Sequence, residues 1–464
     1  YFELTLVRES LKERETLLSA MPHISWPMRF VLPYDKKMQF ENTTPISKIL
    51  AFLMPWNKGR RPAWLIKLGL LIYDKLGSRT ILPASNSINL KTDVAGIPLK
   101  EKFLNGFEYS DCWVEDSRLV ILNARDACHN GANIMPQSKV ISATKTDDGW
   151  YIEVKEKISG KISIFNSKLL INAGGPWVQE VIQNTIKLNS SISVRLVKGS
   201  HIVTKKLYDH EKSYFFQGRD GRIVFAIPYE TNFTLIGTTD VPYDGVNMKP
   251  LCSQAEKKYL LNFISEYFKR QVTLKDIVWS YSGVRPLYDD GSKSASAVSR
   301  DYLLDLDESN KKAPLLNIYG GKITTYRKLA EAALNKVRPI FPDLPNNWTA
   351  GIPLPGGDFA VGSFEELVTE ISESHNYLSK LLVRRLTRHY GTEVHNLLAN
   401  KKTQESLGHY FGKNLYAFEI DWAIENEWVT CAEDFIWRRT KLGLHLSKEE
   451  IKSVEKYIKN KTII

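Results

Sequence analysis

The chain has 464 residues, 43% of them hydrophobic and 25% charged, so it can bury a sizeable core and form two or three domains. Its formal net charge of +11 suits anionic partners: a phosphorylated substrate, a dinucleotide or an acidic membrane surface. The basic residues accompany no recognisable nucleic-acid module, and no run of about 18 apolar residues occurs, so neither nucleic-acid binding nor a membrane span is expected. The four cysteines lack CxxC spacing and nearby histidine ligands, which predicts reduced thiols and no metal site.

The N-terminal segment predicts a helix and then a strand. Apolar residues from Leu4 to Leu18 fall on or near one stripe of a helix over residues 1–20. After Pro22, the run ISWPMRFVLP is strand-like.

Residues 46–76 change in composition. Short apolar pieces alternate here with Lys and Arg, and the segment carries Trp56, Trp64 and Tyr73. Basic residues and interfacial aromatics beside short apolar helices are typical of a contact with an anionic membrane surface. Two core helices flanked by a solvated basic loop would give the same pattern, so both interpretations stand.

The middle of the chain alternates strands with helix starts. A helix is expected after Asp116 or Ser117 as N-cap, with Gly131 ending it. Three strand patterns follow: SKVISATKT, GWYIEVKEK and KISIFNSKLLINA. The last runs into Gly174 and Gly175 before a helix start, which is either a close backbone approach to a ligand or a plain turn.

Residues 193–280 are rich in strand patterns, interrupted by a predicted helix from Ser253 to Phe268. His201 lies between two strand-like pieces in VKGSHIV. A lone histidine in such a place is a hydrogen-bonded structural residue or a catalytic base, and the spacing alone does not separate the two.

A strand from Pro314 to Tyr319, the pair Gly320 and Gly321, and an amphipathic run from Tyr326 to Val337 form the clearest local pattern. Backbone N–H groups at such a turn can meet an anionic or electron-rich ligand. Arg285 and Arg300 precede the turn and could reach the same ligand. A tight turn with solvated cations is the alternative.

The C-terminal part, after the proline-rich stretch FPDLPNNWTAGIPLPGG, has helical periodicity. Ser363 with Glu366 and Ser447 with Glu450 match the capping-box pattern. Arg438 and Arg439 are expected on a solvated basic helix face.

Several motifs, in a fixed order, resemble the FAD-dependent glycerol-3-phosphate dehydrogenases of bacterial inner membranes and mitochondria. They are FEYSDCWVEDSRLV, INAGGPWV, VKGSHIV, IGTTD, SGVRPL, SRDY and GGKITTYRKLAE. The resemblance covers nearly the whole chain, apart from an extra stretch near residues 34–60. It implies an α/β plus α fold: the remainder of a flavin-binding domain of the amino-acid-oxidase type, an antiparallel-sheet substrate domain and an all-helical C-terminal domain.

The implied domains are a discontinuous FAD-dependent oxidoreductase region and a helical domain. The first covers residues 1–350, and the second covers 351–464. Within the first, the flavin-domain pieces are about 1–20, 111–185 and 281–345, and the substrate-domain pieces are about 21–110 and 190–280.

The resemblance further implies oxidation of sn-glycerol 3-phosphate to dihydroxyacetone phosphate, by hydride transfer to FAD and electron transfer to a membrane quinone. It places the protein peripherally on the cytoplasmic face of the inner membrane and allows a homodimer. The residues expected to bind FAD are Gly174, Gly175, Gly320, Gly321, Lys322, Ile323 and Thr324.

The substrate phosphate is assigned to Arg285, Arg300 and Lys322, since guanidinium groups bind phosphate oxygens in pairs. His201 and Arg285 are the catalytic candidates. Among the matched motifs, only His201 has an ordinary pKa suited to accepting the hydroxyl proton.

The sequence departs from the family at its start. The family opens with a βαβ unit of about 30 residues that carries a glycine-rich fingerprint. This sequence begins at Tyr1 within a predicted helix and contains no GxGxxG. An N-terminally truncated form is therefore expected, with two alternatives: an inactive or split remnant without its own FAD site, or a related flavin oxidoreductase acting on an amine or hydroxy acid.

Overall fold

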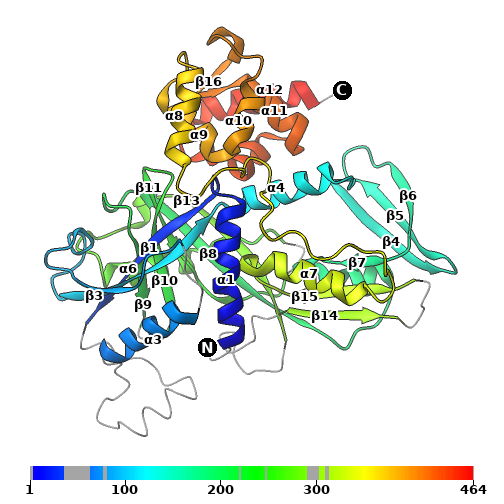
Figure 1. Cartoon of the computed structure of the whole chain (residues 1–464), viewed down its shortest axis with the longest axis horizontal. Helices are drawn as coiled ribbons and strands as arrows, with labels where there is room; N and C mark the ends of the chain where they lie inside the picture. The colour runs from blue at the N-terminus through cyan, green and yellow to red at the C-terminus, as the bar shows by residue number, and fades with distance from the viewer. Residues whose placement is uncertain are drawn as a thin grey trace, which may run out of the picture.

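The structure, a computed structural model of the chain, describes residues 4–35, 63–76, 81–218, 221–245, 248–289, 302–308 and 313–462. In Figure 1 the C-terminal helices, orange to red, form a cluster at one end of the molecule. This cluster rests on a helix and a large sheet, and a smaller β-meander lies on the side away from the bulk of that sheet.

The large sheet has nine strands and is almost wholly antiparallel. Its order is β12-β8-β11-β10-β9-β1-β3-β2. Strand β13 also pairs with β8, along the edge opposite to the one that β11 and β12 share. Only β1 and β9 run parallel. The strands are β1 (Ser25–Tyr34), β2 (Asn86–Asn89), β3 (Asn105–Val114), β8 (Val194–Lys205), β9 (Ser213–Gln217), β10 (Ile223–Tyr229), β11 (Phe233–Gly237), β12 (Val241–Pro242) and β13 (Ile277–Tyr288).

The two faces of this sheet bury different partners. Helix α6 (Gln254–Ser265) covers one face, where Ile202, Phe216 and Leu260 belong to the largest core cluster. Strand side chains alternate, so His201 and Val203 point to the opposite face, beneath the C-terminal helices. Strand β8 therefore contributes side chains to the main core on one face and to the region beneath the C-terminal unit on the other.

Two small sheets lie beside the large one. The meander is β4 (Ser138–Thr146), β5 (Gly149–Glu156) and β6 (Ile162–Ser167); the other sheet is β14 (Tyr302–Asp307), β15 (Leu315–Gly320) and β7 (Leu170–Asn172). The prediction of one strand through KISIFNSKLLINA is wrong. The Ser167 hydroxyl donates to the carbonyl of Leu169 and turns the chain, so β7 leaves the meander and pairs in parallel with β15.

The helices of the first part largely follow their sequence signals. They include α1 (Leu4–Ala20), α3 (Ala63–Leu76), α4 (Asp116–His129) and α7 (Tyr326–Val337). The predicted N-cap of α4 is wrong: Glu115 occupies that position, and its carboxylate accepts a bond from Trp113 Nε1 at 2.8 Å instead of capping the helix. Gly131, with φ of +92°, follows the end of α4 as predicted.

The C-terminal unit is helical apart from one short hairpin. Its elements are α8 (Phe364–Ser374), α9 (Lys380–Tyr390), α10 (Val394–Leu398), β16 (Tyr410–Gly412), β17 (Leu415–Tyr416), α11 (Ala417–Glu427), a π-helical turn (Asp434–Arg439) and α12 (Lys448–Thr462). The capping box of Ser447 and Glu450 is confirmed, whereas the Ser363 side chain caps nothing in α8.

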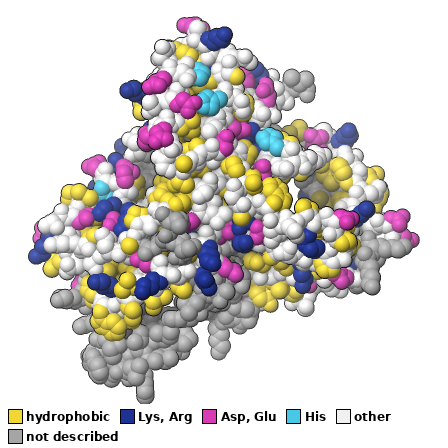
Figure 2. Space-filling model, viewed as in Figure 1, with side chains coloured by type: hydrophobic (Ala, Val, Ile, Leu, Met, Phe, Trp, Pro, Cys, Tyr) yellow, Lys and Arg dark blue, Asp and Glu magenta, His cyan; other side chains and the backbone are white. Residues whose placement is uncertain are grey.

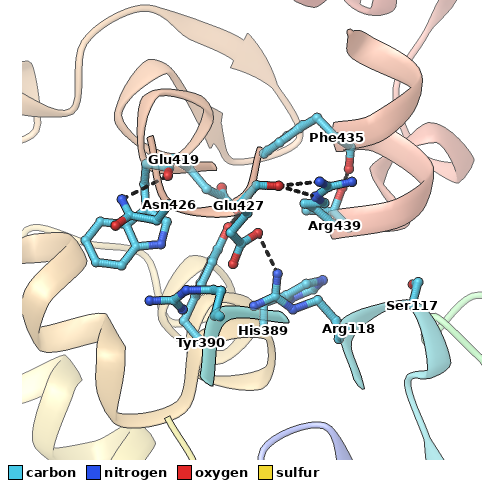
Figure 3. A network of polar contacts seen from close by, with 12 residues as sticks. Ser117, Arg118, His389, Tyr390, Glu419, Asn426, Glu427, Phe435 and Arg439 are labelled. Carbon is cyan, nitrogen blue, oxygen red and sulfur yellow. Dashed lines mark hydrogen bonds and ion pairs between the residues drawn. The ribbon is translucent and has the colours of Figure 1, made fainter. Parts of the chain in front are cut away.

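A buried ion pair joins this unit to α4 (Figure 3). Arg118 Nη1 lies 2.7 Å from Glu427 Oε2, with the two side chains 2% and 0% exposed. The Arg118 guanidinium also lies over the ring of Tyr390, 5.1 Å from its centroid. Arg439 donates to the Glu427 carbonyl, so the prediction that Arg439 is solvated is wrong, while Arg438 is exposed and pairs with Asp434.

None of the helices in the described ranges is long and apolar enough to cross a membrane. In the same ranges, no group of three or more His, Cys, Asp or Glu side chains is placed to hold a metal ion.

We expect Glu427→Gln to lower the free energy of unfolding by about 3 kcal/mol, because it leaves the Arg118 charge buried without its counter-charge. Urea unfolding measures this change. Glu365→Gln is the matched control: Glu365 pairs with Arg384 at 2.6 Å on the surface, and its loss should cost less than about 1 kcal/mol. Equal losses in the two variants would contradict the structural role of the buried pair.

Candidate active site

The pairing of β8 with β13 brings the main candidate residues to one face of the large sheet. Residues directly opposite each other in an antiparallel pair point the same way, and so do residues two apart along a strand. The three pairs concerned are His201 with Tyr281, Gly199 with Gly283, and Val197 with Arg285.

The His201 imidazole is held flat between two neighbours. It stacks on the Tyr281 ring at a centroid distance of 5.0 Å and an interplanar angle of 8°. On its other side lies Gly237, where an added Cβ would come within 2.1 Å of His201 Cδ2. His201 Nδ1 is buried, and no described residue hydrogen-bonds to it.

Burial, and then the nearby Arg285 charge, lower the pKa of His201 to about 4. The imidazole is therefore neutral around neutral pH and can accept a proton from a ligand.

Arg285 is oriented by two residues of the loop after β11. Its Nη1 lies 2.5 Å from Asp240 Oδ1, and its Nη2 donates to Thr238 Oγ1 at 3.3 Å. The Arg285 side chain is 39% exposed. A guanidinium has five N–H donors, so these two contacts leave others for an anion. Asp240 also offsets part of the positive charge, so a dianionic ligand needs a further cation.

The strand floor between the imidazole and the guanidinium is open over Gly283 and covered over Gly199. A Cβ added at Gly283 would meet nothing within 4 Å. At Gly199 a Cβ would lie 2.9 Å from Arg285 Nη2, so the guanidinium reaches back over this residue. Tyr281 and Arg285 lie four residues apart, or about 13 Å along the strand. A ligand of a few carbons with one anionic end suits this space.

A buried carboxylate supports the floor from the α6 side. Glu256 accepts bonds from Ser200 and Thr239 at 2.7 and 2.9 Å and pairs with Lys198 at 2.9 Å. Burial alone would raise the pKa of Glu256, but these bonds and those from Ser253 hold it at about 2. The carboxylate therefore stays charged and fixes the strand beside His201.

The glycine pairs at the two turns form a second cluster. Strands β7 and β15 are parallel, so the turns at Gly174 and Gly175 and at Gly320 and Gly321 lie at the same sheet edge. Positive φ angles of +53° at Gly175 and +108° at Gly321 explain why glycine is needed there. The β13 strand, which carries Arg285, packs against β15 and the 3-10 turn Gly175–Trp177, so the two clusters lie on adjoining elements.

A short 3-10 turn begins at or just after each glycine pair, and no described side chain caps either turn. The turn Gly175–Trp177 and the turn Ile323–Thr325 both begin without a side-chain cap. Lys322 is the residue directly before the second turn. Asn172 fixes the first, since its Nδ2 donates to the Val178 carbonyl at 3.0 Å and to Asn317 Oδ1 at 3.1 Å. Uncapped backbone N–H groups at such turns are suited to anions.

A hollow of about 480 Å³ lies beside β7 and this first turn. Ile171, Asn172, Gly174 and Trp177 line one side of it, and residues of β4 line another. In the described part of the chain no strand pairs with the outer edge of β7. The glycine turn therefore opens directly onto a groove.

The predicted site residues thus fall into two neighbouring groups. His201 and Arg285 share one sheet face, and the glycine pairs with Lys322, Ile323 and Thr324 follow parallel strands. Arg300 lies outside the described residues. Five residues of the first group were not predicted from the sequence, although four lie within the motifs IGTTD, SGVRPL and VKGSHIV and the fifth, Tyr281, directly precedes SGVRPL: Thr238, Asp240, Gly283, Gly199 and Tyr281.

Comparison with known families accounts for nearly the whole chain. A family model described as FAD dependent oxidoreductase matches residues 2–327. A second, described as the C-terminal domain of alpha-glycerophosphate oxidase, matches residues 347–460. The predicted fold class, a flavin-binding α/β region of the amino-acid-oxidase type followed by a helical domain, is confirmed.

Three curated relatives resemble the chain over almost its full length. A glycerol-3-phosphate dehydrogenase from Pseudomonas aeruginosa is 42% identical, covering 99% of this chain and 85% of the relative. A D-erythritol 1-phosphate dehydrogenase from Brucella abortus is 40% identical, covering 100% and 88%. The aerobic glycerol-3-phosphate dehydrogenase of Escherichia coli is 40% identical, covering 99% and 86%.

The fold is also similar to a solved structure. The glycerol-3-phosphate dehydrogenase from Bacillus halodurans complexed with FAD aligns with a TM-score of 0.71 at 23% identity, covering 97% of this chain and 84% of that one.

The buried neutral imidazole predicts a pH-dependent stability. The folded-state pKa of His201 is about 4, below the unfolded value of about 6.5, so its contribution is present above pH 6.5 and is lost as the pH falls toward 4. The stability advantage of wild type over His201→Asn should therefore be about 2 kcal/mol smaller at about pH 5 than at about pH 7. Urea unfolding of both proteins measures it, and a pH-independent difference would show that His201 is not buried in the neutral form.

Proposed function

The chain belongs to the family of FAD-dependent glycerol-3-phosphate dehydrogenases, and from this premise we propose that it oxidises sn-glycerol 3-phosphate at C2 to dihydroxyacetone phosphate. The observation that carries the proposal is the open space over Gly283, with a neutral imidazole at one end and, at the other, an oriented guanidinium that reaches back over Gly199. The named substrates of the Pseudomonas aeruginosa and Escherichia coli relatives support the same reaction.

The described residues fit FAD, the cofactor of the family. A flavin dinucleotide needs backbone that it can approach closely, and a Cβ added at Gly175 would point into open space. We assign FAD to the two glycine turns, with Lys322, Ile323 and Thr324 following the second. Their uncapped N–H groups suit the negative charge that a reduced flavin carries. When bound, FAD accepts the hydride from the substrate carbon.

The substrate phosphate is assigned to Arg285. Asp240 and Thr238 hold the guanidinium in one orientation, so little rotamer freedom is lost when the phosphate binds. Because Asp240 offsets part of the charge, Lys322 and Arg300 are proposed as the further cations that a dianion requires.

His201 is proposed as the base that takes the C2 hydroxyl proton. Its pKa of about 4 leaves it unprotonated and ready to accept. Part of that low value comes from the charge of Arg285, and a bound phosphate dianion would offset that charge. Substrate binding should therefore raise the basicity of His201 at the point where it is needed.

A second candidate substrate is D-erythritol 1-phosphate. It is favoured by the Brucella abortus relative, which is as similar to this chain as the glycerol-3-phosphate enzymes are. Both compounds are polyol phosphates, so the same phosphate site and the same base would serve. The open space over Gly283 leaves room at that residue for the longer carbon chain of D-erythritol 1-phosphate.

A substrate panel tests the reaction. With the FAD-loaded protein held without oxygen, we expect sn-glycerol 3-phosphate to bleach the flavin absorbance fastest. D-Erythritol 1-phosphate is the close comparison, and lactate and an amino acid represent the hydroxy-acid and amine alternatives. Faster bleaching by erythritol 1-phosphate would reassign the substrate within the polyol phosphates, and bleaching by lactate or the amino acid alone would overturn the proposal.

Gly283→Leu should block substrate binding while leaving the fold intact. A Cβ at this position meets nothing, so the added side chain enters the space proposed for the substrate. We expect KM to rise at least about tenfold, with a free energy of unfolding within about 0.5 kcal/mol of wild type. The exposed Gly362, where a Cβ also meets nothing, gives the matched control Gly362→Leu. An unchanged KM in Gly283→Leu would show that the substrate does not bind over Gly283.

We further propose that α3 contacts an anionic membrane surface, where a quinone would receive the electrons. Figure 2 shows hydrophobic side chains gathered over this part of the molecule with Lys and Arg beside them. Trp64, Leu68 and Leu71 are 45–57% exposed on α3.

The other side of α3 is anchored, because Arg14 donates to the Tyr73 hydroxyl at 2.6 Å and Ser85 bonds to Asp74. An anchored helix with one exposed apolar face suits a membrane interface. Residues 46–62 of the segment predicted to make this contact lie outside the described residues.

Sedimentation with vesicles tests this contact. We expect the protein to bind vesicles containing anionic lipid, and a double change, Leu68→Ser with Leu71→Ser, to weaken binding by about tenfold or more by removing apolar area. The exposed Ile158→Ser, on the β5–β6 turn, is the control. Equal binding of all three proteins would place the membrane contact elsewhere.

A further inference from the structure

We propose that the C-terminal unit holds His201 in place through a continuous stack of four rings, with Trp437 as a positioning residue. The proposal rests on the proposed function of His201 for its catalytic consequence, while the geometry stands without it.

The four rings follow one another from the active site into the C-terminal unit. His201 stacks on Tyr281 at 5.0 Å, and Tyr281 contacts Trp279 at 4.9 Å with an interplanar angle of 32°. Trp279 then stacks on Trp437 at 4.3 Å and 10°. Tyr281 and Trp279 are two apart on β13, so the strand itself presents both rings on one face. Trp437 comes from the π-helical turn Asp434–Arg439.

A glycine closes the stack at each end. Gly237 lies against the imidazole, where a Cβ would be 2.1 Å from a ring carbon. Gly443 lies against the indole, where a Cβ would be 2.5 Å from Trp437 Cζ2. No larger residue fits at either end without moving a ring, so backbone confines the rings on both sides.

The far ring is tied to the first part of the chain. The Trp437 carbonyl accepts a bond from Lys441 Nζ at 2.9 Å, and the same Nζ donates to Ser117 Oγ at 2.9 Å. Ser117 lies in the first turn of α4, next to Arg118 of the buried ion pair. The position of Trp437 therefore depends on how the C-terminal unit docks on α4.

Stacking is the main restraint on the catalytic ring. No described residue bonds to His201 Nδ1, so no hydrogen bond at that nitrogen fixes the ring plane. Contacts with Gly237 and Tyr281 set it instead. Removal of Trp437 would leave Trp279 and Tyr281 free to shift toward the vacated space, and the imidazole would follow.

The test uses Trp437→Ala in the full chain, with histidine-labelled NMR and flavin reduction as separate readouts. We expect the His201 ring resonance, assigned with His201→Asn, to shift and broaden, and its titration midpoint to move up toward the ordinary histidine range. With FAD and substrate, kcat should fall about tenfold or more with little change in KM, because a misplaced base affects the chemical step. Trp437→Phe, which keeps a ring, should restore most of both signals.

Trp422→Ala is the matched control. Trp422 belongs to the same unit and lies under the Arg125 guanidinium at 5.8 Å, but it is not part of the stack. It should leave the His201 resonance unchanged. If Trp437→Ala fails to fold, Gly443→Ala presses on the indole without removing it and should give the same His201 shift.

An unchanged His201 resonance and pH profile in a folded Trp437→Ala protein would overturn the proposal. Its failure is distinct from that of the proposed function. If His201→Asn reduces flavin at the normal rate, His201 is not the base, and the NMR comparison still decides whether Trp437 positions the ring.

Discussion

The register between β8 and β13 is the constraint on which the rest of the structure depends. It sets His201 opposite Tyr281, and Arg285 opposite Val197, on one face of the sheet. Side chains alternate along a strand, so a slip of one residue would turn His201 toward α6 and Ser200 toward the opposite face. The Glu256 carboxylate disfavours this slip, because it can bond to the Ser200 hydroxyl only in the observed register.

The C-terminal unit contributes to the site without supplying a residue to its chemistry. The buried pair of Arg118 and Glu427 fixes its docking on α4, and the stack of rings carries that position to His201. A buried ion pair is weak evidence for stability, since its desolvation cost is large, but it strongly disfavours any arrangement that separates the two charges. Specific docking is what a positioning role requires.

Local signals in the sequence predicted local structure well. The period of apolar residues gave α7 from Tyr326 to Val337, and the glycine pairs were placed correctly after strands. Failures came where tertiary contacts decide. Arg439 was taken as solvated because its partner is a backbone carbonyl 12 residues away. The Asp240 contact with Arg285 likewise joins residues 45 apart, which no periodicity reveals. The N-cap of α4 was misplaced for a local reason, since the Glu115 carboxylate bonds to the Trp113 indole and gives no capping signal.

We propose that the glycine turns after β7 and β15 hold FAD beside the His201 and Arg285 face. The most direct measurement is the absorbance spectrum of the purified chain after incubation with FAD and removal of unbound flavin by gel filtration. We expect flavin absorbance to stay with the protein in a molar ratio near one. A folded but colourless chain would contradict it, because the described turns would then not suffice to bind the cofactor.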